Sequence, residues 1–154
     1  FTNLSALFLV LFLSIIVSNN GLQFFVRSDR RAMFQQFVIK EILSSTELDS
    51  VTTGSSSITV IDYQKSKCKP CIKVAPDYLQ LSEKYSSQVQ FYKIDADTST
   101  DALAMLKANG IRSVPTFHVW NCGTRVETIQ GAHIDEVEAI LKDEIRKLEN
   151  NTKQ

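Results

Sequence analysis

The hydrophobic positions of this chain follow two kinds of pattern. Five short runs rich in β-branched and aromatic residues predict β-strands, and four longer segments marked by hydroxyl caps, proline, glycine or a one-sided apolar face predict helices. The run at 58–63 is nearly unbroken in apolarity, which is typical of a strand buried on both faces. Because strands and helices alternate, we expect a layered α/β sheet that a closing hairpin extends with antiparallel strands. The expected strands are 37–40, 58–63, 89–95, 116–120 and 125–130, and the expected helices are 44–51, 71–85, 100–110 and 134–148.

The first 26 residues differ from the rest, since none of them is charged. Residues 4–17 form an apolar run of 14, which is the length of the hydrophobic region of a signal peptide and short of the about 20 residues that span a membrane. This run also lacks the one-sided stripe of a surface helix. We therefore expect a secretory signal or a membrane anchor at 1–26, rather than a buried core helix, and then a linker at 27–36. A folded domain is expected at 37–150 and a tail at 151–154.

The composition is that of a globular protein, with 44% hydrophobic and 22% charged residues. The formal net charge of zero predicts neither a nucleic acid nor a membrane surface as a partner. Three cysteines are too few, and odd in number, for a disulfide framework. A pair at Cys68 and Cys71 with one further thiol at Cys122 is more typical of a redox or a metal site.

The segment K-S-K-C-K-P-C-I-K (65–73) lies between a predicted buried strand and a predicted helix. A helix N-terminus presents unpaired N–H groups and a partial positive charge, which stabilise a thiolate. We expect Cys68 to be the more exposed and more readily ionised sulfur, and Cys71, one turn further on, to attack a mixed disulfide formed at Cys68. Pro70 helps to fix the turn between them. Four lysines add positive charge that favours the thiolate, namely Lys65, Lys67, Lys69 and Lys73.

The segments V-I-D-Y-Q-K-S-K-C-K-P-C-I-K-V-A-P and I-R-S-V-P-T-F, with Gly131 after them, resemble the thioredoxin family over residues 37–149. The resemblance implies a thioredoxin fold of the α/β class, with a central mixed β-sheet of four to five strands and helices on both faces. It also implies that Cys68 is a nucleophile and Cys71 a resolving thiol. The activity implied is thiol-disulfide exchange with protein substrates, with no organic cofactor.

The same resemblance assigns roles to residues outside the cysteine pair. Asp62 would be a buried acid that exchanges a proton with Cys71; a carboxylate at the end of an apolar strand should have a raised pKa, although it could instead cap the next loop. Pro115 would be a cis-proline beside the disulfide, and the backbone of Val114 would pair with an extended substrate. Independently of the resemblance, Pro76 should interrupt and kink the helix predicted at 71–85. The expected substrate-binding residues are Lys67, Lys69, Pro70, Val114, Pro115 and Thr116.

Three positions depart from the family's pattern. The usual Trp-Cys-Gly-Pro-Cys is Lys67-Cys68-Lys69-Pro70-Cys71 here, and Gln64 replaces a second usual aromatic residue. These changes concern the range of partners and the interface with a thioredoxin reductase, which would be the electron donor or acceptor. The lysines could select acidic substrates or simply form a solvated face.

Other interpretations of the cysteine pair are a zinc site and a domain without catalysis. Zinc would need His118 and Cys122 as further ligands, but His118 lies within a predicted strand and Cys122 in a hairpin turn. The second alternative is a docking or chaperone-like subunit of a secretory or export assembly. A leader at 1–26 implies the secretory pathway or an organelle reached through it, with membrane attachment through residues 4–17 if the leader is retained. The zinc site and the non-catalytic subunit remain alternatives at this point, and the reaction could run in the reducing or the oxidising direction.

Overall fold

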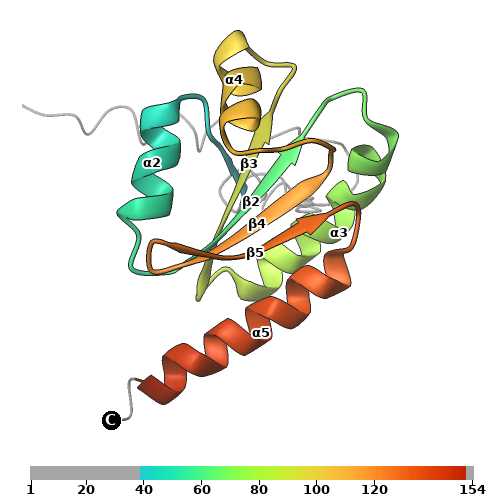
Figure 1. The fold of residues 1–154 in the computed structure, drawn as a ribbon. Helices are drawn as coiled ribbons and strands as arrows, with labels where there is room; N and C mark the ends of the chain where they lie inside the picture. Colours follow the sequence, from blue (N-terminus) through green and yellow to red (C-terminus); the bar gives the residue numbers. More distant parts are fainter. Residues whose placement is uncertain (1–38, 152–154) are drawn as a thin grey trace, which may run out of the picture.

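A single five-stranded sheet with helices on both faces is formed by the residues that the structure describes (Figure 1). The structure is a computed structural model, and it describes residues 39–151. The strands are β1 Ile39–Glu41, β2 Ile58–Gln64, β3 Val89–Asp95, β4 Thr116–Asn121 and β5 Thr124–Gln130. The helices are α2 Ser45–Thr53, α3 Lys69–Tyr85, α4 Thr100–Ala108 and α5 Ile134–Asn151.

The strand order is β1-β3-β2-β4-β5. β1, β3 and β2 are parallel, whereas β4 is antiparallel to β2 and β5 is antiparallel to β4. This confirms the predicted mixed sheet and the closing hairpin. The parallel strands β2 and β3 both end at the upper edge of the sheet in Figure 1, which is where α3 begins.

β2 is the centre of the core and is buried along its whole length except at Gln64. Since successive side chains of a strand point to opposite faces, β2 contributes to two hydrophobic clusters. Val60 belongs to the cluster under α3 and α5, which includes Tyr78 and Leu141. Ile61 belongs to the cluster under α2 and α4. The unbroken apolar run of this strand therefore follows from burial on both faces.

Helix α3 departs from the prediction at its start and in its middle. It begins at Lys69, two residues earlier than expected, and it continues through Pro76 without interruption. A proline inside a helix removes one backbone hydrogen bond and leaves the carbonyl of residue i−4 without its partner. Here that carbonyl belongs to Ile72, and both Ile72 and Pro76 are exposed, so water can satisfy it.

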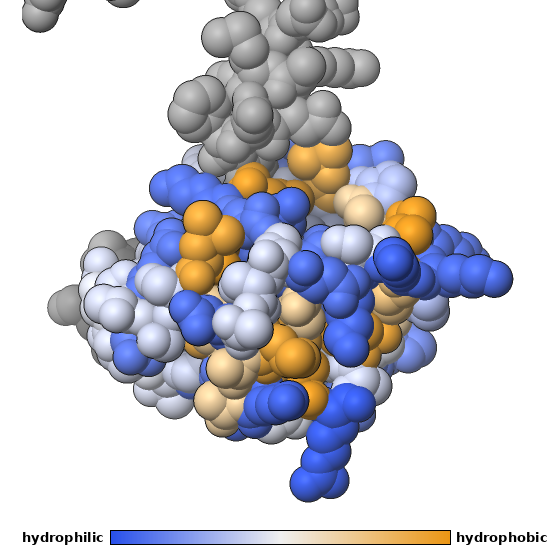
Figure 2. Space-filling view, turned by 90° about the horizontal axis from the view of Figure 1, so that it is seen from above, coloured by the Kyte–Doolittle hydropathy of each residue, from blue (hydrophilic) through white to orange (hydrophobic). Residues whose placement is uncertain are grey.

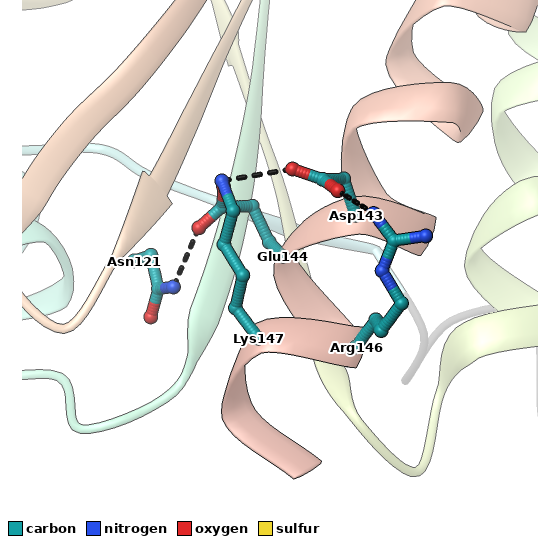
Figure 3. A network of polar contacts seen from close by, with 5 residues as sticks. All are labelled: Asn121, Asp143, Glu144, Arg146 and Lys147. Carbon is teal, nitrogen blue, oxygen red and sulfur yellow. Dashed lines mark hydrogen bonds and ion pairs between the residues drawn. The ribbon is translucent and has the colours of Figure 1, made fainter. Parts of the chain in front are cut away.

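The last helix is fastened to the sheet by a polar network at the end of β4 (Figure 3). The side-chain amide of Asn121 donates to the carboxylate of Glu144 at 2.6 Å, and Lys147 donates to the same carboxylate at 2.6 Å. Lys147 also lies 2.8 Å from Asp143, which forms a further ion pair with Arg146. Glu144 is buried, so these partners compensate the loss of water around its charge.

Several sequence predictions fall outside the described residues. These are the signal or anchor at 1–26, the linker at 27–36, the first two residues of the expected strand 37–40 and the end of the tail 151–154. Among residues 39–151, no helix combines the length and apolarity that a membrane span requires.

Candidate active site

Cys68 is the N-cap residue of α3 and therefore sits at the positive end of the helix dipole. Its backbone N–H donates to the carbonyl oxygen of Lys65 at 3.1 Å, and its Sγ accepts the backbone N–H of Cys71 at 3.3 Å. In α2 and α4 the same capping position is occupied by the hydroxyls of Ser44 and Ser99. A sulfur thus takes the place of an ordinary capping oxygen, with Pro70 in the first turn behind it.

Cys68 and Cys71 are joined by a disulfide, with their Cα atoms 5.2 Å apart. This separation lies within the normal range for disulfides. Cys71 is buried with an exposed fraction of 2%, whereas Cys68 is half-buried. Of the two sulfurs, that of Cys68 is therefore the one that a protein substrate can reach, as predicted.

The loop before β4 lies directly against this disulfide. Cys68 Sγ is 3.5 Å from the carbonyl oxygen of Val114, and the Val114–Pro115 peptide bond is cis, as the resemblance implies. The loop is fixed from two sides: the hydroxyl of Thr116 donates to the carbonyl oxygen of Ser113 at 2.8 Å, and the N–H of Gly131 donates to that of Pro115 at 2.8 Å. Gly131 has a φ of 95°, which favours glycine at this position.

Asp62 is buried within β2, with an exposed fraction of 2%. It follows Val60 on the face of the sheet that α3 covers, and Cys71 precedes Val74 on the buried side of that helix. Burial raises the pKa of Asp62 to about 7; the nearby Lys93 lowers it in part, and Asp95 adds to the rise. The side chain makes no loop-capping hydrogen bond in residues 39–151, and its Oδ1 has no partner there, so the alternative of a loop cap is wrong.

Lys93 is a member of the site that the sequence analysis missed. It is the cross-strand neighbour of Asp62 in β3, and its Nζ lies 3.6 Å from the carboxylate of Glu41 in β1. The three residues form a row of alternating charges across the sheet. These residues become neighbours only through the pairing of β1, β3 and β2, so the sequence alone did not indicate the row.

Two carboxylates at the end of β3 hold the loop between β2 and α3, and they too were missed. The hydroxyl of Ser66 donates to Asp95 Oδ2 at 2.5 Å, and its backbone N–H donates to Asp97 Oδ2 at 3.1 Å. Asp97 in turn donates its backbone N–H to Asp95 Oδ1 at 2.9 Å. These bonds fix the segment that precedes Cys68.

The residues of the zinc alternative are not brought together. His118 is buried in β4, where its ring packs edge-on against Tyr63 with the centroids 4.7 Å apart. Cys122 lies in the hairpin turn that follows β4, with a φ of 47° and its Sγ 3.4 Å from the carbonyl oxygen of Ser56. Within the described part of the chain, no group of three or more histidine, cysteine, aspartate or glutamate residues is arranged to hold a metal ion.

Comparison with known proteins supports the family resemblance seen in the sequence. The family model described as thioredoxin matches residues 39–143. The thioredoxin of Coprinus comatus is 30% identical over 103 residues, which are 66% of this chain and 94% of that protein. The H-type thioredoxin of Chlamydomonas reinhardtii is 35% identical over 82 residues, covering 53% of this chain and 70% of its own length.

Solved structures of thioredoxins have the same fold. The thioredoxin of Malassezia sympodialis superposes with a TM-score of 0.62 at 27% identity, covering 70% of this chain and 90% of its own. Thioredoxin F from spinach chloroplasts superposes with a TM-score of 0.61 at 29% identity, covering 70% of this chain and 93% of its own.

Proposed function

Since the chain belongs to the thioredoxin family and is a thiol-disulfide oxidoreductase acting on protein disulfides, we propose that Cys68 is its attacking sulfur and Cys71 its resolving sulfur. The observation that carries this assignment is the difference between the two positions. Cys68 caps α3 and is half-buried beside Val114, whereas Cys71 is buried one turn further on. An attacking thiolate needs access and positive potential, and a resolving thiol needs only to reach the first sulfur.

In the reducing direction, the Cys68 thiolate attacks one sulfur of a substrate disulfide. The substrate S–S bond breaks, a mixed disulfide with Cys68 forms, and the released substrate sulfur takes up a proton from water. Cys71 then loses its proton to Asp62 and attacks Cys68 Sγ. The mixed disulfide breaks, and the second substrate sulfur leaves as a thiolate that takes up the proton from Asp62, either directly or through water. Cys68 and Cys71 are then joined as in the structure. Two electrons pass to the substrate, and the reverse sequence oxidises a substrate dithiol.

Asp62 is suited to this proton transfer because burial holds its pKa at about 7. A group with a pKa near the working pH accepts and returns a proton most effectively. The position of Val114 supports its backbone as the segment with which an extended substrate pairs. Because its carbonyl oxygen is already 3.5 Å from Cys68 Sγ, an extended segment that pairs with this backbone would bring its own sulfur next to Cys68.

The assignment is tested by trapping the mixed disulfide. We expect the Cys71→Ser variant to accumulate a covalent adduct with a protein substrate through Cys68, detectable by mass spectrometry and released by excess dithiol. Cys68→Ser is the matched control and should form no adduct. An adduct through Cys71 in the control variant, equal in yield to that of Cys68, would contradict the assignment.

The electron partner and the location belong to this proposal as well. A reducing cycle requires an electron donor, and the family supports a thioredoxin reductase, whose interface here would contain Lys67 in place of the usual tryptophan. The apolar run at 4–17 supports entry into the secretory pathway, with membrane attachment if the leader is retained. Reduction of the Cys68–Cys71 disulfide by a thioredoxin reductase with NADPH tests the first point, and the location of the full chain in fractionated cells tests the second.

A further inference from the structure

Positively charged residues are concentrated in the sequence around Cys68. We call Lys65, Lys67, Lys69 and Lys73 the basic collar; all of them are exposed, and they occupy the loop before α3 and its first turn and a half. The chain as a whole has a formal net charge of zero, so this concentration is local. The end of the molecule at which β2 and β3 terminate points up in Figure 1 and faces the viewer in Figure 2, where hydrophilic residues lie between separate hydrophobic ones.

The charges of the basic collar lie at the positive end of the dipole of α3, where they are unfavourable. The first turns of α2, α4 and α5 contain acidic residues, such as Glu47, Asp101 and Asp135, which the positive end of the helix dipole favours. The first turn of α3 contains no acidic residue, and Lys69 is its first residue. Because a positive charge at the N-terminal end of a helix is unfavourable, folding does not account for this placement.

The lysines of the basic collar form no ion pair within residues 39–151. Of the other lysines in the described part of the chain, Lys84, Lys93, Lys142 and Lys147 form ion pairs with acidic side chains, whereas Lys40 and Lys107 do not. Two carboxylates behind the loop, Asp95 and Asp97, both accept hydrogen bonds from Ser66.

From these contrasts we infer that the site selects disulfides carried by extended, acidic segments of protein substrates. The inference rests on the proposed function, since it concerns the segment that docks at Val114. Such a segment would lie beside the lysines that precede and follow Cys68. Arg112, which is exposed two residues before Val114, adds a further positive charge to the loop that lies against Cys68. Acidic groups in the substrate would supply the counter-charges that the chain itself does not, and would accelerate encounter through long-range attraction.

The positive charge has a second effect that must be kept apart from selection. Lysines near Cys68 favour the thiolate and so accelerate attack on every disulfide, whatever its charge. Selection is therefore measured as a ratio of rates for two substrates that differ only in charge. A general change in the reactivity of Cys68 alters both rates equally and leaves this ratio unchanged.

The test uses the reduced full chain and two synthetic peptides with the same internal disulfide, one flanked by glutamates and one by glutamines. Single-turnover rate constants are measured at about 20 mM and about 500 mM salt, where screening is weak and strong respectively. We expect the acidic peptide to react about tenfold faster at low salt, and the ratio to approach one at high salt. The Lys67→Gln/Lys69→Gln variant should lose most of this preference, whereas Lys84→Gln/Lys142→Gln, which removes the same charge far from Cys68, should keep it.

A ratio near one for the wild-type protein at low salt would overturn the inference, and so would equal preferences in the two double variants. In both cases the reaction with both peptides would still support the proposed function. If neither peptide reacts although Cys68 is a free thiol, the proposed function fails together with the inference.

Discussion

Cys68 Sγ and the carbonyl oxygen of Val114 lie 3.5 Å apart, although the two residues are separated by 46 positions in the chain. The contact exists because β2 and β4 are neighbours in the sheet, so that the loop entering β4 passes the N-terminus of α3. The redox pair and the backbone that would align a substrate are thus brought together by strand pairing rather than by sequence proximity.

The capping role of Cys68 predicts a separation of stability from activity. In the reduced protein, Cys68→Ser should unfold at about the same urea concentration as the wild type because serine is a good N-cap residue, whereas Cys68→Ala should be destabilised by about 1 kcal/mol. Both variants should lack disulfide exchange. Equal stability of the serine and alanine variants would show that the sulfur does not cap α3.

The raised pKa of Asp62 predicts a pH-dependent effect on stability. A carboxyl group with a pKa of about 7 in the folded protein and an ordinary pKa of 3.8 takes up a proton on folding between these limits. The folded state therefore binds more protons than the unfolded state, and its stability falls as the pH rises from about 4 to 7. At 1.36 kcal/mol per pH unit, Asp62→Asn should stabilise the protein at pH 8 by up to about 4 kcal/mol and at pH 4 by almost nothing.

The same variant should slow resolution of the mixed disulfide by about 10- to 100-fold at pH 8, because the proton acceptor is lost. Urea unfolding of the reduced proteins at both pH values, combined with single-turnover kinetics, measures the two effects. Asp101→Asn, on the exposed start of α4, is the matched control. A variant that gains stability equally at pH 4 and pH 8 would contradict the assignment of the raised pKa to Asp62.

His118 predicts the opposite trend with pH. Burial and, to a smaller degree, the nearby Arg125 lower the pKa of this histidine to about 4. Between pH 4 and the ordinary pKa of 6.5, the unfolded chain binds a proton that the folded protein excludes, so stability is lost as the pH falls through this range. His118→Leu should therefore stabilise the protein at pH 5 by about 1 to 2 kcal/mol more than at pH 8. Thermal unfolding of the wild type and the variant at the two pH values measures this difference. An equal gain in stability at pH 5 and pH 8 would exclude a buried neutral histidine at this position.

The bonds from Ser66 to the end of β3 predict a positioning role for Asp95. Asp95→Asn weakens the acceptor of the 2.5 Å hydrogen bond from Ser66, so the loop before Cys68 should become more mobile. We expect the rate of disulfide exchange to fall several-fold and amide exchange to increase in residues 65–68, with the fold retained. Ser66→Ala should reproduce both effects. A normal rate of disulfide exchange in both variants would show that these hydrogen bonds are not needed to position the loop before Cys68.

The sequence predicted the sheet, its helices and the location of the cysteine pair because these follow from local patterns. The apolar run at 58–63 indicated a strand buried on both faces, and the place of Asp62 at the end of that run indicated its burial. The exact start of α3 did not follow, because capping by a cysteine is not among the usual start signals. The continuation of the helix through Pro76 depended on solvent exposure, which the sequence does not display.

Residues that act across strands were missed for a different reason. Lys93 becomes a neighbour of Asp62 only through the pairing of β3 with β2, and Ser66 meets Asp95 only because both strands end at the same edge. Such contacts depend on which strands pair and in which register, and the pattern of each strand taken alone does not show this. The cis peptide before Pro115 likewise came from the resemblance and not from composition, since only about 5% of such bonds are cis.

The reactivity of the two sulfurs in the reduced protein tests the central claim most directly. Alkylation by iodoacetamide at pH 7, followed residue by residue with mass spectrometry, should modify Cys68 about tenfold faster than free cysteine and Cys71 more slowly than Cys68. If Cys68 reacts no faster than free cysteine, or if Cys71 is modified first, α3 does not activate the outer sulfur and the mechanism given for this site is wrong.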